Sequence, residues 1–273
     1  MLPLVPSRLS NLVCLVGRKE IDLRYDVRGV FEKALELDPN YAPALAGMSH
    51  VEGFTYRDID SAPLHLERAE RFAARALAID PQLPEAHVAM GRVYGLKYDY
   101  ARAAQEFRVA IHLEPQNILA WDLLSWALAY NQPPDAAEAE KAAREALRLE
   151  PSRFMADYHL GRALMLQGRY QVAEAAFQQA RDLGSDSATG DLGLGQMYLL
   201  QGNSERALPL LEKPSGKNSN NLFWLACAYS ARGDKDKALA AMQGALQLGF
   251  RDFAAIDASP PSLLSAPIPA FSS

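Results

Sequence analysis

Five histidines are the first candidates in this sequence for metal binding or proton transfer: His50, His65, His87, His112 and His159. Each lies in a different segment, and none has a second histidine or a cysteine at the spacing of metal ligands. Histidines that are isolated in this way more often pack or face solvent than bind a metal. We therefore predict no metal site and no bound cofactor.

Other patterns of catalytic chemistry are also missing. The sequence has no GxxxxGK[ST] phosphate loop and no GxSxG nucleophile elbow. Gly193 and Gly195 form a GxG, but they lie in a predicted helix with no strand before it, which disfavours a dinucleotide site. The neighbouring carboxylates Glu138 and Glu140 lie on a predicted helix and fit a solvated surface. The prediction is that this chain is not an enzyme.

Composition narrows the classes of partner. The chain has 273 residues, 49% of them hydrophobic, and a net charge of −5 with both signs spread along it. A nucleic-acid-binding surface needs concentrated Lys and Arg, so we expect no nucleic-acid partner. Two cysteines, Cys14 and Cys227, form no disulfide framework.

No segment has the length of a membrane span, so we expect no membrane partner. The apolar opening, residues 1–17, fits a secretory signal poorly because Pro3, Pro6 and Arg8 interrupt it. A cytoplasmic location is therefore expected.

A motif of Leu or Ile, an acid and Pro recurs along the chain, ending at Pro39, Pro81, Pro115 and Pro151. The step from Pro81 to Pro115 is 34 residues. Glycine, alanine and phenylalanine keep a fixed register to this motif, which a plain helical bundle would not require. The spacing predicts repeated pairs of helices, A and B, that bury their apolar faces only by stacking.

Six copies follow a degenerate first copy at 8–41, and together they predict one repeat domain over residues 1–252. The copies begin at Ala42, Pro84, Ile118, Phe154, Ala188 and Ser219. Between the helices, the copy from Ala42 is predicted to carry a long turn at about Thr55–Pro63. Residues 253–273 are rich in proline and serine and are expected to form a disordered tail.

The clearest copy starts at Pro84 and reads Gly91, Tyr94, Ala103, Phe107 and then Pro115. This pattern resembles the tetratricopeptide repeat (TPR), and the resemblance covers about residues 8–252. It implies an all-α, right-handed α-solenoid of about six to seven helix-turn-helix repeats. It also implies a non-catalytic scaffold that binds a protein or peptide in a concave groove lined by the A helices.

The run from Phe31 to His87 also resembles TPR arrays of bacterial signalling proteins. That resemblance implies an alternative function, a regulatory module separated from a Ser/Thr kinase, a nucleotide cyclase or a winged-helix transcription regulator.

In the TPR family, groove positions are the second, fifth, ninth, twelfth and thirteenth of each copy. Carried onto this sequence, they predict a partner-binding groove of His50, Phe54, Glu85, Arg92, Leu96, Asp122, Trp126, Tyr130, Tyr158, Arg162, Gln196 and Phe223.

Trp126, Tyr130, Tyr158 and Arg162 carry the most weight, because Trp, Tyr and Arg dominate interface energetics. Packing against a neighbouring copy is the alternative for these aromatic side chains. The carboxylate clamp of chaperone-binding TPR domains is absent, since Val88 and Arg92 stand where that clamp has Lys and Asn. An uncapped last repeat, with Leu239, Met242 and Leu246, predicts possible self-association.

Overall fold

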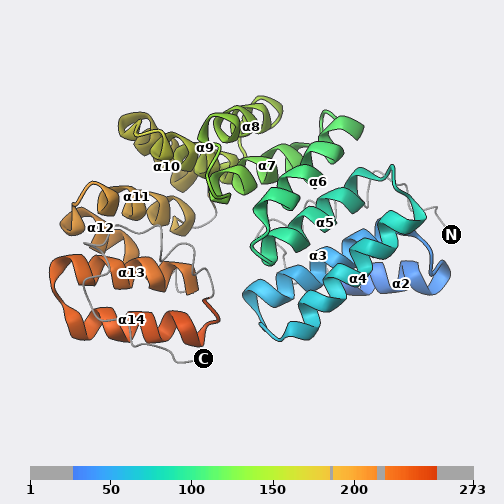
Figure 1. Cartoon of the computed structure of the whole chain (residues 1–273), viewed down its shortest axis with the longest axis horizontal. Coiled ribbons are helices and arrows are strands. Elements are labelled where there is room, and N and C mark those ends of the chain that lie inside the picture. Colours follow the sequence, from blue (N-terminus) through green and yellow to red (C-terminus); the bar gives the residue numbers. More distant parts are fainter. Residues whose placement is uncertain (1–26, 185–186, 214–218, 251–273) are drawn as a thin grey trace. The chain divides into compact units, whose positions relative to one another are not determined.

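The computed structural model describes residues 27–184, 187–213 and 219–250. These residues form thirteen α-helices and no strand, as the repeat pattern predicts (Figure 1). The predicted start of the first copy, Cys14 and the predicted tail at 253–273 lie outside the described residues.

The chain divides into two compact units, Met1–Pro151 and Ser152–Ser273. The helices of the first unit are α2 (Val27–Leu37), α3 (Ala42–Asp58), α4 (Pro63–Ile79), α5 (Pro84–Leu96), α6 (Tyr100–Leu113), α7 (Ile118–Tyr130) and α8 (Ala136–Leu149). Those of the second are α9 (Phe154–Leu166), α10 (Tyr170–Leu183), α11 (Ala188–Leu200), α12 (Ser204–Leu211), α13 (Ser219–Arg232) and α14 (Lys235–Gln247).

Every A helix begins at the residue where the sequence begins a copy, so α3, α5 and α7 are the A helices of the first unit. Each A helix packs against the B helix that follows it. The A helices of one unit also contact one another in series: α3 with α5 and α5 with α7, then α9 with α11 and α11 with α13.

Polar side chains in the turns within and between repeats set the helix ends. Asp99, Asn117, Asp135 and Asn203 each accept a hydrogen bond from the backbone N–H three residues later and so cap a helix N-terminus. In the recurring motif, Asp80 accepts a hydrogen bond from the N–H of Gln82 at 3.0 Å, which shapes the turn before α5.

The copy from Ala42 differs from the sequence prediction. Helix α3 continues to Asp58 and α4 begins at Pro63, so both helices have 17 residues. Most of the extra residues therefore extend the helices, and the turn between them is short. The long turn predicted at Thr55–Pro63 is wrong, because proline at Pro63 is compatible with the first helical position and does not lengthen the loop.

The tight turn between helices A and B uses the left-handed backbone region. Gly168, Gly202 and Gly233 have φ angles of 73°, 74° and 87°. Tyr98 occupies the same register position in its copy with a φ of 61°. Glycine adopts this conformation without a Cβ penalty, whereas tyrosine does not.

The core depends on large B-helix side chains that lie on A-helix glycines. A Cβ on Gly161 of α9 would lie 2.7 Å from the Phe177 ring of α10, and Gly193 of α11 abuts the same ring. Phe107 covers Gly91 in the same way, since a Cβ added to Gly91 would lie 2.6 Å from the Phe107 ring. Phe177 and Phe107 are fully buried as a result, and the alanines around them let the helices approach closely.

Two glycine substitutions should separate packing from backbone conformation. Gly161→Ala inserts a methyl group into the Phe177 ring and should lower the free energy of unfolding by about 2–3 kcal/mol. Gly168→Ala meets no atom within 4 Å, so only its positive φ is penalised, by about 1 kcal/mol. Urea unfolding followed by circular dichroism measures both. Equal losses in the two variants would contradict the packing role of Gly161.

Candidate functional site

The A helices of the first unit carry most of the predicted groove residues on one series of neighbouring helices. We call this surface the first A-helix face: Phe54 of α3, Glu85, Arg92 and Leu96 of α5, and Trp126 and Tyr130 of α7. All six side chains are half-buried, so each presents part of its surface to solvent. They are the predicted site residues of this unit that remain accessible.

His50 of α3 lies beneath this face and is only 2% exposed. Neither ring nitrogen has a hydrogen-bond partner among the described residues. Burial, followed by the positive charge of Arg92, holds the pKa of His50 well below its usual range. Its imidazole is therefore neutral at pH 7, and Asp122 of α7 is likewise buried.

Two glycines bring the A helices close together on this face. Leu96 packs against Gly53 of α3, where an added Cβ would lie 3.2 Å from the leucine Cδ1. The indole of Trp126 lies directly on Gly95 of α5, with no room for a side chain there. Trp126 therefore packs against the preceding copy with one part of its ring, and the remainder is accessible.

Trp126 belongs to a cluster of aromatic rings. Its ring centroid lies 5.5 Å from that of Tyr100 in an edge-to-face arrangement and 6.2 Å from that of Tyr130. Tyr100 and Tyr130 lie 5.7 Å apart, and Tyr98 adds an edge contact to Tyr100. Such contacts hold the rings in fixed positions at little further entropic cost. The sequence prediction missed Tyr100 because it opens a B helix.

In the second unit, two predicted groove residues form part of the core. Tyr158 of α9 is 6% exposed and packs on Phe177 at 5.7 Å between centroids. Phe223 of α13 is fully buried and stacks on Phe250 at 4.6 Å. As they lie in the structure, these rings stabilise the unit and offer little surface to a partner.

The polar predicted residues of the second unit do come together. Arg162 of α9 donates a hydrogen bond from Nη1 to Oε1 of Gln196 on α11 at 3.4 Å. Gln196 is buried, and its Nε2 has no partner among the described residues. Trp126 and Tyr130 lie in the first unit, whereas Tyr158 and Arg162 lie in the second. The grouping of these four residues stays a prediction.

No group of three or more His, Cys, Asp or Glu side chains that could hold a metal ion occurs in the described part of the chain. Over those same residues, none of the helices is both long and apolar enough to cross a membrane.

Family models of the tetratricopeptide repeat match residues 124–188, 167–219 and 219–248. A tetratricopeptide-repeat protein of Parabacteroides merdae has a solved structure that aligns with a TM-score of 0.65 and 14% identity, over 92% of this chain and 97% of that one. One chain of the Cut9–Hcn1 hetero-tetramer structure aligns with a TM-score of 0.66 and 16% identity, over 94% of this chain and 48% of that one. Residues 124–248 therefore consist of tetratricopeptide repeats, and the chain has the fold of tetratricopeptide-repeat proteins.

The curated relatives that the chain matches are longer than the chain. Superkiller protein 3 of Schizosaccharomyces pombe is 24% identical over 86% of this chain, which spans 18% of that protein. Anaphase-promoting complex subunit 3 of the same yeast is 23% identical over 78% of this chain, which spans 31% of it. The resemblance to arrays of bacterial signalling proteins stays a prediction.

Two aspartates stand at the fourth position of the A helices in the second half of the TPR array. Asp191 of α11 pairs with Nζ of Lys213 at 2.7 Å. Asp157 of α9 is also buried, but no cation among the described residues pairs with it. Burial without a counter-charge raises the pKa of Asp157 to about 6.

Asp157→Asn should therefore stabilise the protein at neutral pH. Because the folded pKa is above the unfolded one, the stability associated with protonated Asp157 is present below about pH 4 and is lost as pH rises through about 6. The free energy of unfolding of Asp157→Asn should exceed that of the parent by about 1–3 kcal/mol at pH 7.5, and the difference should vanish near pH 4.

Urea unfolding at several pH values measures this difference. Asp236→Asn, at an exposed carboxylate of α14, is the matched control and should show no such trend. A difference that does not depend on pH would contradict the assignment.

Proposed function

We propose that this protein is a non-catalytic scaffold that binds a peptide or protein partner on the first A-helix face. The observation that carries the proposal is the half-buried set of Arg92, Trp126 and Tyr130 on the neighbouring helices α5 and α7. Tryptophan, tyrosine and arginine are the residues that most often dominate binding energy in protein interfaces. The aromatic contacts of Trp126 and Tyr130 reduce the entropy that binding would otherwise cost.

The family supports the general part of this proposal. TPR proteins are in general interaction scaffolds without catalytic activity. One structure with the same fold is described as a hetero-tetramer of two different proteins, and one curated relative is a complex subunit. These descriptions concern those proteins, and fold alone does not identify the partner of this one.

The chemistry of the face favours a partner with both apolar and acidic groups. The aromatic cluster offers ring surfaces, and the nearby Arg92 can donate hydrogen bonds to a carboxylate. The neutral His50 beneath the face adds no charge at pH 7. The chaperone-type carboxylate clamp is absent from the sequence, so we do not propose binding of that kind.

Substitutions on the face should weaken partner binding without unfolding the chain. We expect Trp126→Ala and Arg92→Ala each to weaken the affinity at least tenfold, because a hot-spot residue typically contributes about 2 kcal/mol. The partner would be captured with the parent protein from the native organism, identified by mass spectrometry, purified, and titrated by calorimetry against each variant.

Arg144→Ala and Val109→Ala are the matched controls, since both side chains are exposed on B helices. Each should bind as the parent does, and circular dichroism should show unchanged helix content in all four variants. Unchanged affinity in Trp126→Ala and Arg92→Ala would place the binding site elsewhere.

We also propose that the last helix pair mediates self-association. Leu239 of α14 is 43% exposed, and Leu248, just after this helix, is 53% exposed. Met242 and Leu246 of α14 are half-buried. In the copy from Pro84, the positions of Leu239 and Met242 hold the buried Ala104 and Phe107, which the next A helix covers. A second copy of the chain could cover this apolar surface.

Leu239→Lys should therefore shift the protein towards the monomer in sedimentation velocity over a range of concentrations. Burying the lysine charge against an apolar partner surface would cost its hydration and so disfavour the dimer. Gln243→Lys adds the same charge at another exposed position of α14 and should have a smaller effect. A parent protein that stays monomeric at about 100 µM would contradict self-association, since standard dimer interfaces bind more tightly than that.

A further inference from the structure

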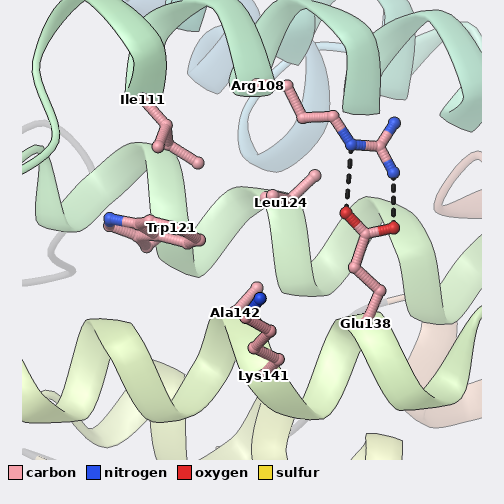
Figure 2. Close-up of a pocket in the computed structure, with 7 residues that line it drawn as sticks. All are labelled: Arg108, Ile111, Trp121, Leu124, Glu138, Lys141 and Ala142. Atoms are coloured by element: carbon pink, nitrogen blue, oxygen red, sulfur yellow. Dashed lines mark hydrogen bonds and ion pairs between the residues drawn. The ribbon is translucent and has the colours of Figure 1, made fainter.

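A hollow of about 150 Å³ opens on the B-helix side of the first unit, between α6, α7 and α8 (Figure 2). Its apolar lining consists of Ile111 from α6, Trp121 and Leu124 from α7, and Ala142 from α8. Its polar rim consists of Arg108, Glu138 and Lys141. None of these residues belongs to the first A-helix face.

The hollow results from a local departure from the repeat pattern. In the preceding copy, the positions of Trp121 and Ala142 hold His87 and Glu106, allowing for the two extra residues near Pro133. His87 Nδ1 and Glu106 Oε2 lie 2.7 Å apart, so that pair fills the corresponding space. Alanine at position 142 is too short to do so, and the face of the Trp121 ring is left open (Figure 2).

The ring of Trp121 is fixed even though its face is open. Its Nε1–H donates a hydrogen bond to the carbonyl oxygen of Pro115 at 3.0 Å. His87 contacts the carbonyl oxygen of Pro81 at the same distance, so this anchor is common to both copies. A fixed, partly open indole is a preformed apolar surface, and binding to it requires little reorganisation.

One side of the rim is held by an ion pair between two B helices. Arg108 of α6 donates two hydrogen bonds to the carboxylate of Glu138 on α8, at 3.1 Å from Nε and 2.6 Å from Nη2 (Figure 2). This bidentate pair is neutral overall and closes one end of the hollow.

Lys141 leaves the rim with a net positive charge. The side chain is exposed, and within the described ranges of the chain it makes no ion pair. It rises from α8 next to Ala142 toward the hollow (Figure 2). The site therefore combines an apolar lining with a single uncompensated cation at its edge.

We propose that this hollow binds one aromatic side chain of an acidic peptide segment, with a neighbouring carboxylate of that segment beside Lys141. A cavity of about 150 Å³ lined by apolar side chains accommodates a benzene ring. Aromatic rings prefer offset or edge-on contact with an indole such as that of Trp121. This second site is separate from the first A-helix face and does not depend on the function proposed for that face.

Three blocked dipeptides test the proposal directly: the N-acetyl, C-amide forms of aspartyl-phenylalanine, lysyl-phenylalanine and aspartyl-alanine. The readout is the indole N–H signal of Trp121 in ¹H–¹⁵N spectra of the full chain, assigned with Trp121→Phe among the three tryptophans. We expect aspartyl-phenylalanine to shift this signal and to bind about two- to fivefold more tightly than lysyl-phenylalanine, as for an exposed ion pair. Aspartyl-alanine should leave the signal unchanged.

Two variants separate the apolar part of the site from its charge. Ala142→Met fills the hollow and should abolish the shift. Lys141→Glu alters only an exposed side chain, so the fold should persist, and it should reverse the preference so that lysyl-phenylalanine binds more tightly. Lys235→Glu makes the same change at an exposed position of α14 and should leave both affinities unaltered. A Trp121 signal that no phenylalanine peptide moves, or a preference that Lys141→Glu does not reverse, would overturn the proposal.

Discussion

The contact of a large side chain with glycine on a neighbouring helix is the constraint on which the rest of this structure depends. Phe177 of α10 lies against Gly161 of α9 and Gly193 of α11, so one ring joins two successive copies. Because neither glycine has a Cβ, the helices approach closely enough to bury the ring completely. A helix pair alone could not bury such a residue on both sides, which is why the copies must stack.

The same rule shapes the candidate binding face. Gly53 and Gly95 let Leu96 and Trp126 settle between neighbouring A helices, and the aromatic cluster forms around the tryptophan. This close approach has an electrostatic cost, because it buries polar groups such as His50. The pKa of His50 falls in consequence, so the imidazole remains neutral among the A helices.

Local departures from the repeat give each copy its own chemistry while the helices stay in register. Tyr98 occupies a turn position that is glycine in three other copies, and its ring lies at the edge of the aromatic cluster. Ala142 stands where the preceding copy has Glu106, which pairs with His87. The shorter alanine leaves the hollow beside Trp121. An array of similar units can thus present different surfaces.

The sequence alone determined the repeat, the start of each A helix and the pairing of helices, because Gly, Ala, Phe and Pro at fixed spacing dictate local turns and nearest-neighbour packing. It did not determine which groove positions stay accessible. Tyr158 and Phe223 follow the family's groove register, yet the structure packs them on Phe177 and Phe250. Only the tertiary structure decided this, because the exposure of a side chain depends on the size of the residues that neighbouring helices place against it, and those residues lie far away in the sequence.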